Sequence, residues 1–187
     1  MSCRIEDYGL IGDCETAALV GRDGSIDWLC WPTFDADACF AALLGESRHG
    51  RWQIAPDGEV TNISRRYWDN TLILQTEFET ADGTIALIDF MPPRGKASDI
   101  VRLVRGVSGR VKVRMELVIR FGFGIDIPWV KKSSDGSALL AICGQDMMVL
   151  RTPVATRGVD LTTVADFEVG AGETVPFVLT YGPSHLP

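Results

Sequence analysis

The segment GRDGSIDWLCWPTFDADACFAALL, residues 21–44, contains the strongest turn and strand signals of this sequence. Its dipeptide Asp23-Gly24 accepts the positive φ of a tight turn and joins two apolar runs, residues 17–20 and 26–31. Two short apolar runs on either side of such a dipeptide predict a β-hairpin. The chain is therefore expected to begin with paired strands.

The pattern changes after the second arm of this hairpin. Pro32 has no amide hydrogen for a strand ladder, so the strand is expected to end there. Beyond it, Asp35 or Asp37 precedes apolar residues at helical spacing, and Gly45 follows them. These positions predict one short helix near residues 36–44.

The remainder of the chain alternates between β-rich runs and turn signals. Residues 71–91 predict a second hairpin around Asp82-Gly83, and residues 100–107 and 111–121 predict a third across Ser108-Gly109. Such spacing without helical periodicity is typical of a sandwich. We predict an all-β chain, a large antiparallel β-sandwich over residues 1–182, with residues 183–187 beginning a linker.

Charge and hydropathy exclude two classes of partner. The 187 residues contain 25 acidic and 18 basic side chains, which gives a net charge of −7 and a pI near 4.8. A chain this acidic repels phosphate backbones, so nucleic acid is not an expected partner. The first residues lack the pattern of a signal peptide, and no run approaches the ~20 apolar residues of a membrane span. A cytoplasmic location without membrane contact is expected.

Cysteine and histidine usage predicts neither a metal site nor a cofactor. The five cysteines are an odd number with no Cys-x-x-Cys pair, and the chain has two histidines. Most of the cysteines lie in apolar surroundings, which indicates buried, reduced thiols.

Several motifs together resemble the amino-terminal domain of bacterial family 15 glycoside hydrolases, the glucoamylase-like and trehalase-like enzymes. The resemblance covers nearly the whole chain. It rests on residues 5–13, 23–32, 34–35, 66–67, 71–78, 89–92, 120–121, 128–129 and 176–183.

The resemblance implies a supersandwich-like domain that precedes a helical α/α barrel holding the catalytic carboxylates. By this resemblance the chain is a non-catalytic domain that supports and orients a barrel hydrolysing α-glucosidic bonds with inversion. Two departures remove polar groups, because Thr33 stands where the family usually has arginine and Gly122 where it tends to have aspartate. Both departures argue against direct sugar contact by these loops.

Eight loop residues match motifs that could approach the mouth of such a barrel. They are candidates for a domain interface or for sugar-proximal loops, against the alternative that they support the hairpins locally. The candidates are Tyr8, Asp13, Trp31, Phe34, Asp35, Arg120, Phe121 and Trp129.

No catalytic carboxylate pair is predicted within this chain. Asp35, Asp89 and Glu77 are available, but Glu77 lies in a predicted strand and Asp89 is most simply a hydrogen-bond partner at a strand end.

The five tryptophans are expected to fill the core, with Trp31 as the exception because it precedes Pro32. An alternative function follows from that exception: a free-standing carbohydrate-binding module that presents Trp31 and Trp129 to α-glucans or trehalose. A third hypothesis is a subunit joined to a separately encoded barrel, which would expose a broad apolar patch.

Overall fold

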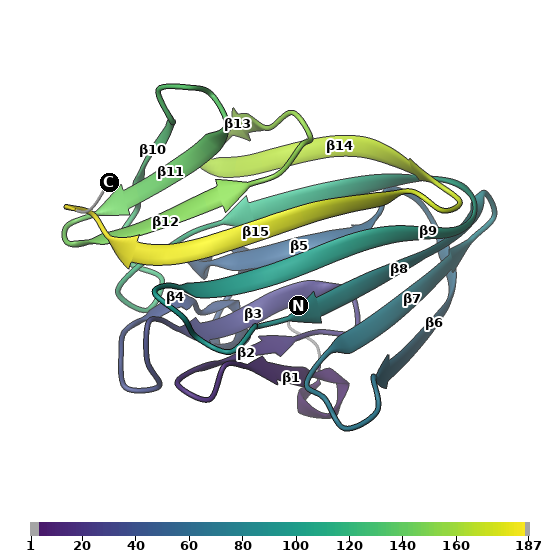
Figure 1. Ribbon diagram of the computed structural model, residues 1–187, viewed down its shortest axis with the longest axis horizontal. Helices are drawn as coiled ribbons and strands as arrows, with labels where there is room; N and C mark the ends of the chain where they lie inside the picture. The colour runs from purple at the N-terminus through teal and green to yellow at the C-terminus, as the bar shows by residue number, and fades with distance from the viewer. Residues whose placement is uncertain (1–3, 186–187) are drawn as a thin grey trace.

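The computed structural model describes residues 4–185 and consists almost wholly of β-strands (Figure 1). No helix among these residues is long and apolar enough to cross a bilayer. The strands are β1 (Gly9–Gly12), β2 (Ala17–Val20), β3 (Ser25–Cys30), β4 (Ala38–Phe40), β5 (Arg51–Pro56), β6 (Val60–Tyr67), β7 (Leu74–Thr80), β8 (Gly83–Phe90), β9 (Ser98–Val118), β10 (Trp129–Lys132), β11 (Ala138–Cys143), β12 (Asp146–Arg151), β13 (Arg157–Val159), β14 (Thr162–Gly170) and β15 (Thr174–Pro183). Three single-turn 3-10 helices are η1 (Ile5–Asp7), η2 (Ala42–Leu44) and η3 (Ser47–His49).

The strands form two layers that share β9, and every pairing between named strands is antiparallel. The first layer has the order β1-β2-β3-β5-β9-β14-β13, with β4 paired to β3. The second has the order β6-β7-β8-β9-β15-β12-β11-β10. The predicted all-β antiparallel fold is confirmed, as are the hairpins β2–β3 and β7–β8.

The third predicted hairpin is wrong, because residues 98–118 form one long strand rather than two arms. The first half of β9 pairs with β8 and β15, and its second half pairs with β5 and β14. Gly109, at φ 65°, lies where the strand passes from one layer to the other. A Cβ atom at Gly106 would lie 2.0 Å from the carbonyl oxygen of Gly170, so the close approach there requires glycine.

The predicted helix near residues 36–44 is also wrong. Its first part is strand β4, and only the turn η2 follows. The carbonyl of Ala38 accepts the amide of Phe123 at 3.0 Å, and the carbonyl of Cys39 accepts the amide of Arg120 at 3.2 Å. Pairing with β3 and with these distant amides satisfies the backbone, so tertiary partners outweigh the local helical spacing. Leu44, the last residue of the predicted helix, is exposed.

The core lies between the layers and is apolar. Ile26 and Trp52 contribute to it from the first layer, and Phe78, Leu87 and Phe177 from the second, each with almost no exposed surface. Burial of apolar surface is the main favourable contribution to folding.

The predicted burial of the cysteines holds in part. Cys30 and Cys39 are buried free thiols, Cys143 is half-buried and Cys14 is exposed. Cys3 lies outside the described residues.

One ion pair crosses this core. On β9, the Arg102 guanidinium donates through Nε to Asp89 Oδ1 at 2.8 Å and through Nη2 to Oδ2 at 3.1 Å. It also donates to carbonyls of the opposite layer, to Trp52 at 2.5 Å and to Gly24 at 2.8 Å. Both ionic side chains are fully buried. Arg102 therefore connects the second layer directly to the first.

Removing this arginine is expected to destabilise the fold strongly. Arg102→Met leaves the Asp89 carboxylate buried without its partner and two carbonyls without a donor, so we expect a loss of about 3–5 kcal/mol in the free energy of unfolding. Urea denaturation followed by tryptophan fluorescence measures it. The control Arg114→Met breaks a half-exposed pair with Glu116 and is expected to cost at most about 1 kcal/mol. Equal losses for the two variants would contradict this account.

The turn between β2 and β3 is expected to require glycine at Gly24, whereas the turn between β5 and β6 does not require it at Gly58. A Cβ at Gly24, where φ is 79°, would lie 2.2 Å from the carbonyl oxygen of Ile54, whereas one at Gly58 would meet nothing within 4 Å. We expect Gly24→Ala to lower the free energy of unfolding by more than about 1 kcal/mol and Gly58→Ala to leave it unchanged or raise it slightly. A shift in urea midpoint of the same size and sign for both would refute the prediction.

Candidate functional site

The candidate residue Asp13 lies at the centre of a polar cluster. Its Oδ2 accepts from Arg94 Nε at 3.0 Å, Arg94 Nη2 at 2.9 Å and Ser98 Oγ at 2.8 Å. Its Oδ1 accepts the backbone amides of Glu15 at 3.0 Å and Thr16 at 2.9 Å. The cluster fixes the turn after β1 against the segment that leads into β9.

Trp31 belongs to the same cluster and is buried, with 4% of its surface exposed. Its Nε1 donates to Ser98 Oγ at 2.7 Å, and its ring centroid lies 5.8 Å from that of Tyr181 on β15. The prediction that Trp31 is the exception to core packing is therefore wrong. It ties the first hairpin to the last strand and offers no platform for a sugar.

Two opposing effects act on the Asp13 carboxyl. Burial raises its pKa, but the hydrogen bonds from Ser98, from the amides of Thr16 and Glu15 and from Arg94 stabilise the charged form. The pKa of Asp13 is consequently lowered from its ordinary value. The cluster contains an ionised carboxylate at neutral pH.

Phe34 and Asp35 lie at the exposed tip beside this cluster. The amide of Phe34 donates to the carbonyl of Glu15 at 3.1 Å, while the Phe34 ring is largely exposed. Asp35 accepts the Thr33 hydroxyl at 2.7 Å, and this hydrogen bond lowers the pKa of Asp35. The structure therefore brings Asp13, Trp31, Phe34 and Asp35 together.

Tyr8 lies elsewhere, beside η1 and strand β3. Its hydroxyl donates to Asp27 Oδ2 at 2.6 Å, and Asp27 Oδ1 accepts the Ser25 hydroxyl at 2.5 Å. The contact orders the first residues of the described chain against the hairpin. This bond to Asp27 is separate from the hydrogen bonds of the Asp13 cluster.

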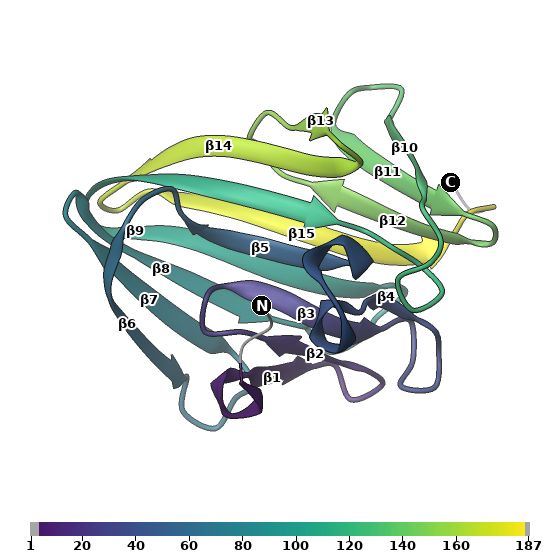
Figure 2. The same ribbon diagram turned by 180° about the vertical axis from the view of Figure 1, so that it is seen from behind.

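Arg120 and Phe121 lie after the end of β9, where the loop folds back onto β4. The amide of Phe121 donates to the carbonyl of Asp126 at 2.9 Å, and the Phe123 ring lies 6.4 Å from the ring of Trp28. Phe121 itself is buried. As Figures 1 and 2 show, this loop, β4 and the carboxyl end of strand β15 lie at the same end of the molecule.

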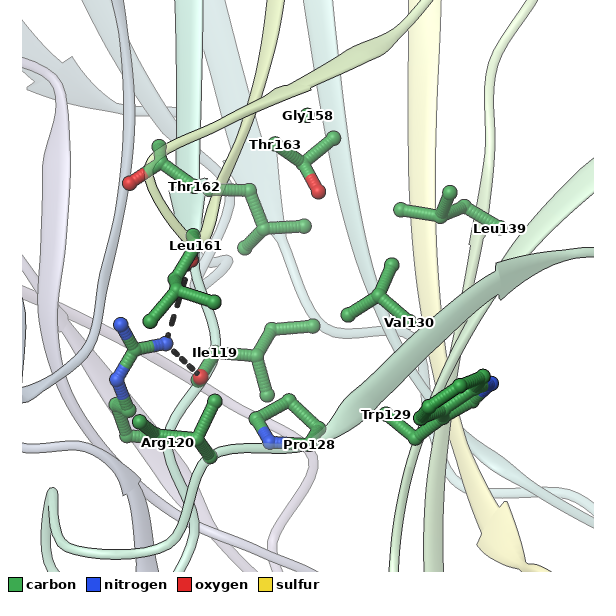
Figure 3. Close-up of a pocket in the computed structure, with 12 residues that line it drawn as sticks. Ile119, Arg120, Pro128, Trp129, Val130, Leu139, Gly158, Leu161, Thr162 and Thr163 are labelled. Atoms are coloured by element: carbon green, nitrogen blue, oxygen red, sulfur yellow. Dashed lines mark hydrogen bonds between the residues drawn. The ribbon is translucent and has the colours of Figure 1, made fainter.

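An apolar hollow of about 290 Å³ opens between this loop and the turn that joins β13 to β14 (Figure 3). Trp129, the last candidate, lies at its edge with 74% of its surface exposed. Other lining residues include Ile119, Pro128, Leu139 and Leu161.

Exposed apolar side chains line the hollow and continue into the loop before β10, and together they form what we call the apolar face. Isolated exposed apolar residues are ordinary, whereas a contiguous group marks a contact surface. Within the apolar face, Ile127, Trp129, Val130 and Leu161 line the hollow, and Phe123 and Ile125 belong to the loop before it; all six are exposed.

Arg120 forms the side of the hollow opposite Trp129 in Figure 3 and is only 7% exposed. Its Nη1 donates to the carbonyls of Ile119 at 2.7 Å and Leu161 at 3.4 Å. Burial lowers the pKa of Arg120. Within residues 4–185 no carboxylate forms an ion pair with Arg120.

The acidic residues considered for catalysis have structural partners. Asp89 is bound to Arg102 inside the core, and Glu77 Oε1 accepts the side-chain amide of Gln75 at 2.6 Å. Across the described chain, no group of three or more His, Cys, Asp or Glu side chains is arranged to hold a metal ion.

The sequence was compared with models of known protein families. A family model described as trehalase-like, N-terminal, matches residues 1–179. The chain belongs to this trehalase-like N-terminal family. The match covers nearly the whole chain, so the family assignment applies to both layers of the sandwich.

Relatives of this trehalase-like domain carry the name trehalase. The trehalase of Thermoplasma volcanium is 32% identical over 139 residues, which cover 71% of this chain and 22% of that protein. Trehalase 2 of Sulfolobus acidocaldarius is 26% identical over 163 residues, 87% of this chain and 25% of that protein. The trehalase of Mycolicibacterium smegmatis is 38% identical over 85 residues, 46% of this chain and 13% of that protein. The chain thus spans a quarter or less of these relatives.

Sequence reasoning missed several residues that build the site of this trehalase-like domain. Arg94 and Ser98 follow the Pro92-Pro93 break and carry no motif, yet they join Asp13 to Trp31. Leu161 carries no turn signal in the sequence, yet it lies in the turn between β13 and β14.

The Asp13 cluster is expected to make stability depend on acid pH. Because its folded-state pKa is depressed, its stabilisation is present above the unfolded value of about 4 and is lost as the pH falls through the folded pKa. At pH 7 we expect Asp13→Asn to cost about 1.5–3 kcal/mol, the range for hydrogen bonds to a charged group. The difference from the parent chain should shrink below about pH 4.

Urea denaturation between pH 2.5 and 7 measures this difference. The control Glu168→Gln changes an exposed carboxylate that forms no ion pair in the described part of the chain, and it should follow the parent at every pH. A pH-independent difference for Asp13→Asn would show that the Asp13 charge is not what stabilises the cluster.

Proposed function

We propose that this chain is a non-catalytic amino-terminal domain of a trehalose-hydrolysing glycoside hydrolase, and that it supports and orients a catalytic domain that follows it. The family match and the relatives named trehalase support the reaction class. The fraction of those relatives that the chain spans, 22% and 25%, supports a larger parent. By the family 15 resemblance, that catalytic domain is an inverting α/α barrel.

The position of the apolar face near the end of the last strand is the main support for this proposal. Trp129 pairs with Ile142, Ile142 with Met147, and Met147 with Gly182 near the end of the last strand. Three strand spacings separate Trp129 from Gly182, about 14 Å. A domain that follows β15 therefore begins beside the largest group of exposed apolar side chains described above, and packing against it would remove that surface from water.

The placement of acidic residues supports a non-catalytic role. Inverting hydrolysis needs a carboxylic acid and a carboxylate about 6.5–9.5 Å apart across a site open to sugar. Asp89 is fully buried against Arg102, and Glu77 is bound to Gln75 within a strand. The free thiols Cys30 and Cys39 suit a reducing compartment, which favours a cytoplasmic parent.

The proposal predicts that the 187-residue chain does not hydrolyse trehalose, whereas the complete product of its gene does. Released glucose and the intact mass of the native product are the measurements. A product of about 20.5 kDa, the mass of this chain, would contradict the proposed parent. Trehalose hydrolysis by the chain alone, abolished by one carboxylate substitution within it, would contradict the non-catalytic role.

One observation favours a second function, a carbohydrate-binding module. Trp129 is exposed, and an indole face can pack on a pyranose ring. Calorimetric titration of the chain with trehalose and maltooligosaccharides separates the two functions. A supporting domain gives no heat of binding, whereas a module binds and loses binding in Trp129→Ala but not in the control Trp68→Ala.

A further inference from the structure

Arg120 is largely buried, and no carboxylate among the described residues pairs with it. Its Nη1 donates to two neutral carbonyls, those of Ile119 and Leu161, and the second contact is long at 3.4 Å. Its Nε and Nη2 donate to no side chain or carbonyl of residues 4–185, and they keep contact with solvent at the open hollow. Covering this surface would take the charge out of water, which is costly unless an opposite charge and hydrogen bonds replace the lost hydration.

The other inward-facing arginines of this chain show what is missing. Arg102 Nε and Nη2 bind the two separate oxygens of Asp89, the two-point geometry in which this pair is strongest. Arg94 Nε and Nη2 share one oxygen of Asp13, Oδ2. In both cases a carboxylate faces the guanidinium. Arg120 has the burial of its counterparts but lacks the carboxylate.

The turn beside Arg120 holds an apolar side chain outward at a conformational cost. Asp160 and Leu161 have φ of 46° and 61°, as a two-residue type I′ turn requires, although leucine disfavours this region. The Leu161 side chain is nevertheless exposed, next to the hollow that Arg120 and Trp129 border. Leu161 and Trp129 are therefore placed to exclude water around Arg120 once this surface is covered.

The charges around the apolar face favour an acidic partner. Lys131 and Lys132 follow Trp129 on β10, are exposed, and form no ion pair with any described residue. Asp126 and Asp160 belong to the neighbouring loops but form no ion pair with Arg120. Arg120, Lys131 and Lys132 against Asp126 and Asp160 give 3 − 2, a formal charge of +1 for these segments of a chain whose net charge is −7.

We propose that Arg120 is the anchor for an aspartate or glutamate side chain of the domain that follows this chain, with a neighbouring apolar side chain of that domain in the hollow. This inference rests on the proposed function and specifies its interface. The carboxylate accepts from Nε and Nη2 of Arg120 in the two-point geometry. Trp129 and Leu161 surround the pair and exclude water, the arrangement typical of residues that dominate an interface.

A sugar suits this hollow less well. Its wall is mainly apolar, formed by residues such as Ile119, Pro128 and Leu139, and the hydroxyls of Thr162 and Thr163 are the side-chain oxygens that line it. A pyranose presents hydroxyl groups around its whole rim, and each would need a partner there. Sugar binding is therefore the competing outcome of the test.

The test compares Arg120→Met, Arg120→Lys and the control Arg114→Met, each in the 187-residue chain and in the complete gene product. Hydroxyl-radical labelling of Trp129, read by mass spectrometry at increasing urea, reports whether the apolar face is covered. Thermal unfolding of the 187-residue chain reports any purely structural role of the arginine.

In the parent sequence we expect Trp129 to be labelled in the 187-residue chain and protected in the complete product. In the complete product, Arg120→Met should weaken docking by about tenfold or more, seen as labelling of Trp129 at lower urea. Arg120→Lys should keep part of the protection, because it keeps the charge but not the two-point geometry. Arg120→Met removes the donor to the carbonyls of Ile119 and Leu161 but also removes a charge that no carboxylate pairs, so it should lower the melting temperature of the 187-residue chain much less than Arg102→Met does. Arg114→Met should change no Trp129 labelling.

Three other outcomes overturn the inference, and they are distinguishable. Equal labelling of Trp129 in the chain and the complete product removes the proposed interface, and the proposed function with it. Protection that survives Arg120→Met leaves the proposed function in place and refutes the anchor alone. If trehalose or maltose protects Trp129 in the 187-residue chain, and Arg120→Met abolishes that protection, the site binds sugar instead of a carboxylate.

Discussion

The Asp89–Arg102 ion pair is the contact on which the rest of this structure depends. The apolar core supplies most of the stability, but burial of apolar surface has no direction and does not fix how two layers are placed against each other. Arg102 fixes that placement, because its fork binds Asp89 in one layer and the carbonyls of Trp52 and Gly24 in the other. The first hairpin is thereby held against β5 and β9 at a defined position.

Strand β9 makes the two ends of the sandwich different. At one end it crosses between layers around Gly106 and Gly109, so that end is closed by continuous backbone. At the other end β9 finishes, and the loop after it folds onto β4 beside the last residues of β15 (Figure 2). Loops placed on a rigid scaffold are where binding residues gather. The apolar face lies at this open end.

Three arginines of this chain point inward, and their partners show which of them serve the fold alone. Arg102 and Arg94 each face a carboxylate that the chain itself provides, and both connect segments far apart in the sequence. Arg120 has only the carbonyls of Ile119 and Leu161. Two of these inward-facing arginines are thus paired within the chain, and the third lies beside exposed apolar side chains. This third arginine is suited to pair with a carboxylate of another domain. The interface we propose thus follows from how this arginine differs from the other two.

The all-β class and the hairpins at residues 17–31 and 71–91 could be predicted from the sequence, because turn residues and alternation act over a few neighbouring positions. The family could be predicted from the motifs that the chain shares with it. The sequence also pointed to Asp13, Arg120 and Trp129, but it could not predict their surroundings. Only the tertiary structure decided that residues 98–118 form one strand, that residues 38–40 pair with β3 instead of forming a helix, and that Trp31 is buried. Each of these depends on partners distant in sequence, such as the amides of Arg120 and Phe123 that pair with β4. Local pattern fixes which residues turn and alternate, whereas the backbone and charge partners available in the folded chain decide which of those local preferences prevail.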